Sequence, residues 1–192
     1  MKKFLSLIML STLQVFSMEL MLFEGIKELN TRKVETALSK KANPNNLICF
    51  SNEDKIPFIS YAAQAWITRS PVFDHEVDDK GCIKISECTI ERRRKHCMQN
   101  DKIIIQNLLK YDANPFIVDL QGMTCLHHAV ENGHLHIVKI IIEHVIKNYD
   151  QNHLSYFLQI KNNAGLTAAQ LAKQKEEIEI YKYLESFNAY IL

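Results

Sequence analysis

The sequence lacks the short motifs that mark several large enzyme classes. Only five glycines occur among its 192 residues, and none forms the Gly-x-x-x-x-Gly-Lys loop whose backbone amides bind phosphate. Neither a His-Glu-x-x-His zinc motif nor a Gly-x-Ser-x-Gly nucleophile motif is present. We therefore expect a protein without catalytic residues, bound metal or cofactor.

Net charge is also nearly absent. The 23 lysines and arginines almost balance the 22 aspartates and glutamates, which gives a net charge of +1. A charge this small supplies no general attraction to nucleic acid or to an anionic membrane, so neither is expected as a partner. The apolar content of 47% is ordinary for a soluble globular protein and is enough for one continuous core.

A stretch long enough to span a membrane is missing as well. The apolar stretch Phe4–Phe16 has 13 residues, whereas a transmembrane helix needs about 20. It follows the basic start Met1-Lys2-Lys3 and precedes the small residue Ser17, which is the pattern of a cleaved secretory signal peptide. We predict a signal peptide over 1–17, a mature protein over 18–192 without a stable membrane span, and export to the periplasm or the medium. Without cleavage, the stretch predicts membrane association or an apolar helix packed on the next segment, although it has no polar face.

A turn followed by two helices is the strongest local prediction. Gly122 fits a tight turn with positive φ, and Thr124 stands where its hydroxyl can cap the first turn of a helix. Leu126 and Ala129 are three residues apart and therefore share one helix face. Gly133 is placed to end that helix in a left-handed conformation, and an apolar stripe with helical spacing follows it.

These residues together resemble one ankyrin repeat, whose pattern is Gly-x-Thr-Pro-Leu-His-x-Ala followed by a Gly-His turn. The resemblance covers residues 119–141 and departs from the pattern at Cys125, which replaces proline. It implies a scaffold that binds other proteins, in which the Thr124 and His127 side chains hydrogen-bond to each other. The positions with structural roles are Gly122, Thr124, Leu126, His127, Ala129 and Gly133, with Gly165 and Thr167 in a second copy.

A single repeat cannot bury its own apolar face, so further copies are expected. Gly165 and Thr167 repeat the turn 43 residues after Gly122 and Thr124, against a family period of about 33. The extra length falls in Asn148–Tyr156, a polar segment that predicts a loop. Two upstream segments resemble the motif that closes a repeat. We predict an all-α ankyrin-repeat solenoid of four repeats, over residues 18–45, 52–115, 119–147 and 162–187.

The second repeat contains an insertion of about 34 residues, over 68–100. Its acidic residues come first and its basic residues later, and loops of this length are often functional. Cys82, Cys88, His96 and Cys97 lack the spacing of a zinc knuckle, whereas an oxidising compartment would permit a disulfide between two of the three cysteines, with the pair left open. The alternative hypothesis is therefore an exported module whose inserted segment, stabilised by a disulfide or a metal, carries the binding role.

Stacked repeats line up their turns and first helices along one concave surface. The resemblance implies that the protein, as a monomer, binds an unidentified protein partner there. Apolar residues at the turn tips suit a protein partner, and His128 and His136 are expected at the surface. The predicted contact residues are Leu120, Gln121, Met123, His128, Glu131 and Asn132 in the third repeat, and Asn163, Ala164, Leu166, Lys173 and Gln174 in the fourth.

Overall fold

The computed structural model describes residues 17–49, 55–64 and 87–188, and within these ranges the chain is mostly helical. This confirms the predicted all-α class. The first described helix covers residues 17–27. The other helices are α2 (Thr31–Ser39), α3 (Phe58–Gln64), α4 (Glu87–Lys110), α5 (Cys125–Glu131), α6 (Leu135–Asn148), α7 (Gln151–Gln159), α8 (Ala168–Gln174) and α9 (Ile178–Asn188). Two short strands, β1 (Leu47–Cys49) and β2 (Lys55–Pro57), pair antiparallel with Ile48 opposite Ile56.

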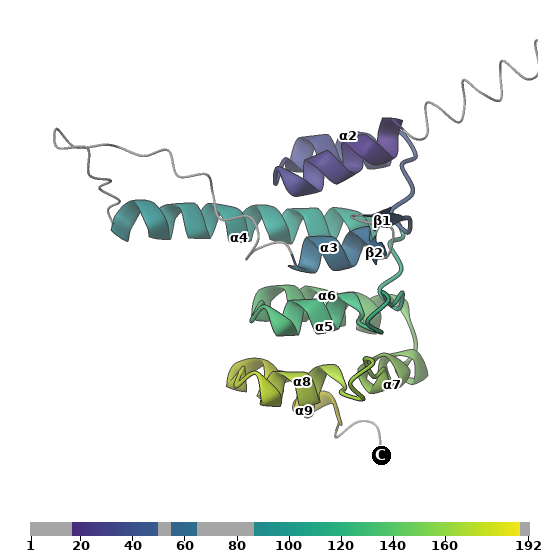
Figure 1. Cartoon of the computed structure of the whole chain (residues 1–192), viewed down its shortest axis with the longest axis vertical. Coiled ribbons are helices and arrows are strands. Elements are labelled where there is room, and N and C mark those ends of the chain that lie inside the picture. The colour runs from purple at the N-terminus through teal and green to yellow at the C-terminus, as the bar shows by residue number, and fades with distance from the viewer. Residues whose placement is uncertain (1–16, 50–54, 65–86, 189–192) are drawn as a thin grey trace, which may run out of the picture.

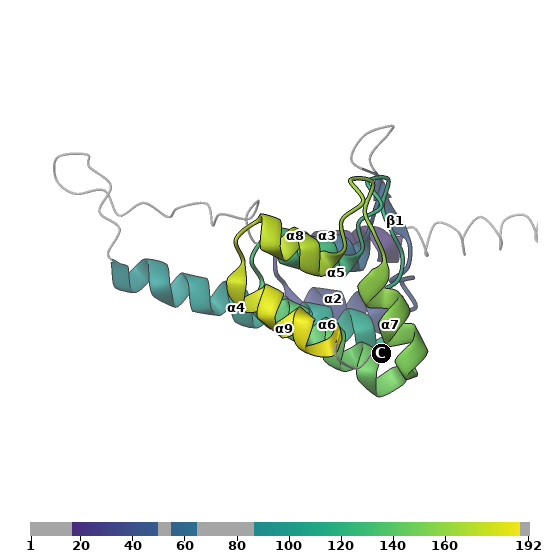
Figure 2. The ribbon, with the colours of Figure 1, turned by 90° about the horizontal axis from the view of Figure 1, so that it is seen from below.

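The helices are stacked as pairs and form two rows (Figures 1 and 2). One row contains α3, α5 and α8, and the other contains α2, α4, α6 and α9. Each helix turns an apolar stripe toward the opposite row, which removes that stripe from water. One cluster of buried side chains runs through the stack, from Leu22 in the first helix to Leu184 in α9. A continuous core therefore joins all the helix pairs.

The connections on one side of the stack are hairpin-like turns, which we call fingers. The second finger is formed by β1 and β2, the third by residues 119–123 and the fourth by residues 162–166. The third finger is closed by the Asp119 N–H, which donates to the Met123 carbonyl at 3.0 Å. The fourth is closed in the same way, because the Asn162 N–H donates to the Leu166 carbonyl at 3.0 Å.

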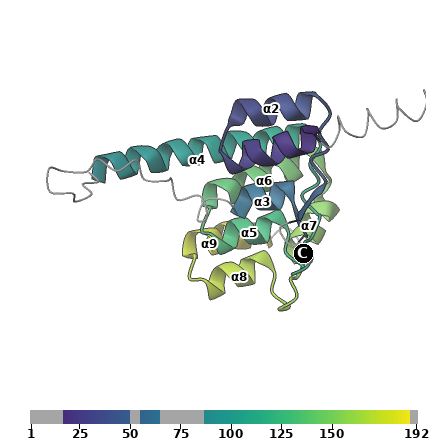
Figure 3. The same ribbon diagram turned by 45° about the horizontal axis from the view of Figure 1, so that its top comes forward.

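α4 is longer than its neighbours, and its first part projects beyond the stack (Figures 1 and 3). Its 24 residues begin at Glu87, so residues 87–100 of the predicted insertion are the start of this helix. Neither glycine nor proline interrupts the sequence from Glu87 to Lys110, and the helix therefore continues into the repeat without a break. The predicted insertion over 68–100 therefore overlaps the projecting start of α4, and its bounds stay a prediction. Residues 65–86, which include Cys82, lie outside the described residues.

The loop predicted over Asn148–Tyr156 is also corrected. α6 extends to Asn148 and α7 begins at Gln151. The Asp150 carboxylate caps α7 by accepting the His153 backbone N–H at 2.8 Å. Farther along α7, Phe157 is fully buried against the core. The segment begins with polar residues, which predicted a loop, but its buried apolar residues lie near the end of a short amphipathic helix.

Candidate functional site

The surface that faces the fingers is formed by α3, α5 and α8. In Figure 2 the fingers stand at one end of this row and project from it, which gives the molecule an angled cross-section. We call the exposed surface of α3, α5, α8 and the fingers the concave face. The partner residues predicted from the sequence belong to these elements, except for Asn132, which directly follows α5. Their exposure and hydrogen bonds decide which of them a partner can reach.

The turn that leads into α5 has the hydrogen bonds that the resemblance implied. The Thr124 hydroxyl lies 2.9 Å from His127 Nδ1 and accepts the His127 backbone N–H at 3.4 Å. His127 Nδ1 also accepts the Thr124 N–H at 3.3 Å, which completes a capping box. On the other side of the ring, His127 Nε2 lies 3.2 Å from the Leu166 carbonyl in the fourth finger. The predicted pair is confirmed, and its histidine also links two neighbouring repeats.

Burial keeps His127 neutral. Loss of solvent around the ring lowers the pKa of His127, although the hydrogen bond to the Leu166 carbonyl opposes that shift. A neutral imidazole with its hydrogen on Nε2 satisfies every contact of the ring, because Nδ1 then accepts and Nε2 donates. This geometry describes a structural histidine and not a metal ligand or a catalytic base.

Thr167 starts α8 with an equivalent box. Its side chain accepts the Gln170 N–H at 3.3 Å, and the Gln170 side-chain oxygen accepts the Thr167 N–H at 3.0 Å. Glutamine therefore replaces the histidine of the third repeat without loss of the cap. Three turn glycines predicted from the sequence, at positions 122, 133 and 165, all have positive φ.

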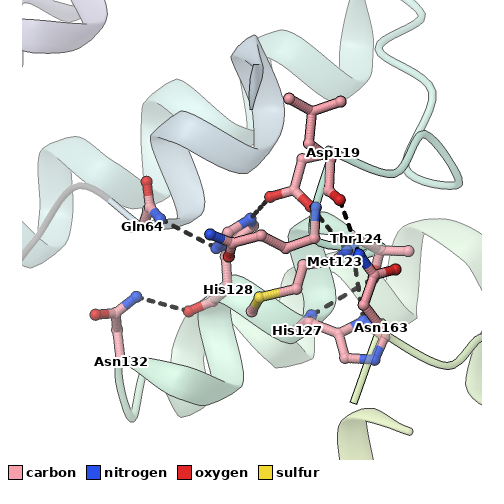
Figure 4. Close-up of polar contacts among 10 residues, drawn as sticks. Gln64, Asp119, Met123, Thr124, His127, His128, Asn132 and Asn163 are labelled. Carbon is pink, nitrogen blue, oxygen red and sulfur yellow. Dashed lines mark hydrogen bonds and ion pairs between the residues drawn. The ribbon is translucent and has the colours of Figure 1, made fainter. Parts of the chain in front are cut away.

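His128 was expected on the surface, and that prediction is wrong. The side chain is only 1% exposed and lies between α3 and the third finger. Its Nε2 is 2.8 Å from Asp119 Oδ2, and its Nδ1 is 3.2 Å from Gln64 Nε2. Figure 4 shows the His128 ring between the side chains of Gln64 and Asp119. Because the ring has a polar partner on each side, burial leaves neither nitrogen unsatisfied.

The Asp119 carboxylate accepts most of the hydrogen bonds that hold the third finger and His128 together. Its Oδ1 accepts the backbone N–H groups of Gln121 and Met123, each at 2.9 Å, while Oδ2 faces His128. Burial opposes ionisation, but the hydrogen bonds from His128 and from the two amides outweigh it and lower the pKa of Asp119. The carboxylate is therefore charged and fixed, with its side chain only 4% exposed.

The remaining predicted contact residues fall into three groups. Met123 is 5% exposed and packs in the core, so its predicted exposure at a turn tip is wrong. Leu120 is 61% exposed and is the most accessible apolar residue of the third finger. Asn132 and Leu166 are half-buried, and Gln121, Glu131, Asn163, Ala164, Lys173 and Gln174 are exposed. His136, also predicted at the surface, is half-buried.

Sequence reasoning missed Asp119 and Gln64. An aspartate just before a Gly-containing turn often binds the turn's own amides, so Asp119 had a recognisable signal. Gln64 had none, because it lies 64 residues before His128 and belongs to a repeat whose threonine and histidine positions hold Ile56 and Ile59. Only the packing of α3 on α5 brings it to His128.

The other reactive side chains form no chemical site among the described residues. Burial raises the pKa of the Cys125 thiol to about 12, so this cysteine is not a thiolate nucleophile. His134 Nδ1 lies 3.0 Å from the Ala63 carbonyl, and burial lowers the pKa of His134 to about 4. No group of three potential metal ligands occurs in the described part of the chain. Side chains of the cysteines at 82, 88 and 97 lie outside it.

Comparison with known proteins agrees with the geometry. The family model for ankyrin repeats, in three copies, matches residues 95–191, about half of the chain. A search of curated proteins found no match. Among the residues that the structure describes, no helix has the length and apolar character needed to cross a membrane. Ankyrin repeats are a protein-interaction module without enzymatic chemistry of their own. Together with the stacked helix pairs and the Thr124–His127 turn, the family match places this chain in the ankyrin-repeat family, as a protein-binding scaffold.

Proposed function

We propose that the concave face binds a protein partner, and that the third and fourth fingers make the central contact. The observation that carries this proposal is the exposure of Leu120, at 61%, on a finger that is otherwise held by hydrogen bonds. An apolar side chain kept in water on a rigid support costs little entropy to bury in an interface. Gln121, Asn163 and Ala164 surround it with uncharged exposed groups.

The two fingers present one surface because they are bonded to each other. The Asn163 N–H donates to the Gln121 carbonyl at 2.9 Å, and the Asn163 side-chain amide donates to the Leu120 carbonyl at 2.9 Å. A partner that covers Leu120 therefore also meets Asn163 and Ala164. The half-buried Leu166 continues this surface toward α8.

Charged groups lie farther from the finger tips, at the ends of α5 and α8. The Lys175 Nζ lies 3.6 Å from Glu131 Oε1, and the Lys173 Nζ lies 5.8 Å from the centroid of the Tyr181 ring. These pairs are exposed, so each contributes little to stability. Exposed charges at the edge of an interface serve mainly to orient a partner and exclude wrong ones.

The test is capture of a partner with immobilised protein, residues 18–192, as wild type and as two variants. Leu120→Arg changes the finger tip, whereas Ile146→Arg changes an apolar residue of similar exposure, 48%, on α6 in the other row of helices. A partner of the concave face is retained by the Ile146 variant and loses at least about tenfold in affinity with the Leu120 variant, as expected for a buried anchor residue. Equal binding to all three proteins would place the site elsewhere.

We also propose that the protein is exported after removal of residues 1–17. The basic start, the short apolar stretch and the small residue Ser17 support this proposal. Mass spectrometry of the N-terminus of the protein from its native source is the direct test. A first residue of Met18 supports export, and an intact Met1 in the soluble fraction rejects it.

A further inference from the structure

The hydrogen bonds around His128 connect three parts of the concave face. Gln64 is the last residue of α3, His128 lies in α5, and Asp119 begins the third finger. Beyond Asp119, the amides of Gln121 and Met123 hold the finger tip on the same carboxylate. The contacts drawn in Figure 4 therefore run without interruption from the end of α3 to the finger that exposes Leu120.

The fourth repeat provides a comparison within the same molecule. Asn162 takes the place of Asp119, and its Oδ1 accepts the N–H groups of Ala164 and Leu166, each at 3.0 Å. Leu171 takes the place of His128 and is 5% exposed. The fourth finger thus has the same internal turn, but no polar side chain of α8 binds the residue that begins it. Of these two fingers, both of which the structure describes, the third is the one that a buried charged group ties to the helix behind it.

Because the His128–Asp119 hydrogen bond is buried, it favours one orientation of the third finger relative to α5. The side chains of His128 and Asp119 are 1% and 4% exposed, so water cannot replace either partner. If the finger swings away from α5, the Asp119 carboxylate loses the His128 N–H in a place where no solvent compensates for it. Gln64 restrains the other side of the ring, and it therefore fixes the position from which His128 donates.

We propose that His128 is a positioning residue, which acts through Asp119 to hold the third finger in its binding orientation and couples that finger to the end of α3. Its importance for partner binding rests on the proposed function of the concave face. The coupling itself is a property of the free protein. A partner that reaches Leu120 never contacts His128, yet the affinity depends on it because an unclamped finger must be ordered on binding.

We call the contacts from Gln64 through His128 to Asp119 the clamp. Hydrogen exchange of the finger amides tests the clamp without any partner. Asp119 Oδ1 accepts from Gln121 and Met123, and Asn162 Oδ1 accepts from Ala164 and Leu166, so the two fingers supply matched pairs of amides. We expect His128→Leu to accelerate exchange of the Gln121 and Met123 amides about tenfold relative to those of Ala164 and Leu166, as loss of a buried hydrogen bond to a charge implies. Equal acceleration in both fingers would show a general loss of stability and would overturn the proposal.

A second set of variants keeps the test valid if His128→Leu does not fold. His128→Gln retains a donor for Asp119 and an acceptor for Gln64, so it should restore most of the protection of the third finger. Gln64→Ala leaves the His128–Asp119 pair in place and removes only the restraint behind it. Gln159→Ala is its matched control, because Gln159 is likewise the last residue of a helix and its amide donates to the Ser155 hydroxyl at 3.4 Å.

We expect Gln64→Ala to increase exchange of the third-finger amides about threefold, with no change in the fourth finger, and Gln159→Ala to change neither. No difference between these two variants would remove α3 from the clamp and overturn the coupling. Partner capture by the same variants separates this proposal from the proposed function. If exchange changes as expected and capture does not, the clamp exists but the concave face is not the binding site.

Discussion

At the scale of single residues, two turns between helices differ in whether glycine occupies the position with positive φ. Gly133 ends α5 with a φ of 68°, and a side chain there would meet the Glu177 carboxylate at 2.7 Å. One repeat later, Glu176 adopts a φ of 61° at the corresponding turn before α9. A residue with a Cβ pays about 1–2 kcal/mol for this conformation. The fourth repeat therefore stores strain that the third avoids.

Glu176→Gly should raise the free energy of unfolding by roughly 0.5–1 kcal/mol. The relief of left-handed strain exceeds the conformational entropy that a new glycine gains in the unfolded chain. Glu179→Gly is the control, since it makes the same chemical change three residues later inside α9, where it should lower stability by about 1 kcal/mol. Urea denaturation of the three proteins measures both differences. A loss of stability in both variants would show that the turn is not strained.

At the scale of elements, α7 is an addition to the repeat pattern that packs through a few aromatic side chains. The Phe116 ring lies 5.0 Å from that of Phe157 and 5.1 Å from that of Tyr149, both edge-to-face. Phe157 is 1% exposed, whereas the neighbouring Tyr156 is 63% exposed. The helix is therefore held mainly by Phe157, with Leu158 beside it.

Phe157→Ala should lower the free energy of unfolding by about 3–5 kcal/mol, because it leaves a cavity lined by the core. Tyr156→Ala, on the next position of the same helix, should cost less than about 1 kcal/mol, since its ring is mostly in water. Thermal or chemical denaturation followed by circular dichroism compares the two. Similar losses for both variants would mean that α7 is not anchored by its buried face.

What the sequence predicts well are elements fixed by their own residues. The Thr124–His127 turn depends on residues three apart, so the motif alone located it and the structure confirms it. α7 was missed because its polar first residues match a loop and its two buried positions come last. The clamp at His128 was beyond sequence reasoning, because burial of that ring depends on Gln64 from a distant and irregular repeat. Contacts between residues close in the sequence could be predicted, whereas contacts that depend on how distant helices pack could not.

At the scale of the whole molecule, the third repeat concentrates histidines that folding keeps neutral. Burial lowers the pKa of His127, His134 and His136 below the ordinary value of 6.5, for His134 to about 4. Two of them bind neighbouring repeats: His127 faces the Leu166 carbonyl, and His134 faces that of Ala63. The same side chains therefore join the solenoid and make its stability depend on pH.

Stability should fall as the pH falls below about 6.5. The unfolded chain binds a proton at His134 near that value, whereas the folded chain does so only near pH 4. The contribution of His134 is thus complete above pH 6.5 and is lost between pH 6.5 and about 4, which amounts to roughly 3 kcal/mol at the lower end. His127 and His136 act in the same direction. Urea denaturation at intervals from pH 8 to pH 4 measures how the free energy of unfolding changes with pH.

His134→Gln should be less stable than wild type at pH 8, because the substitution removes packing and the hydrogen bond to the Ala63 carbonyl. The variant should nevertheless lose less stability on acidification. Parallel pH profiles for the two proteins would show that His134 does not titrate in this range, and the acid sensitivity would then belong to other groups.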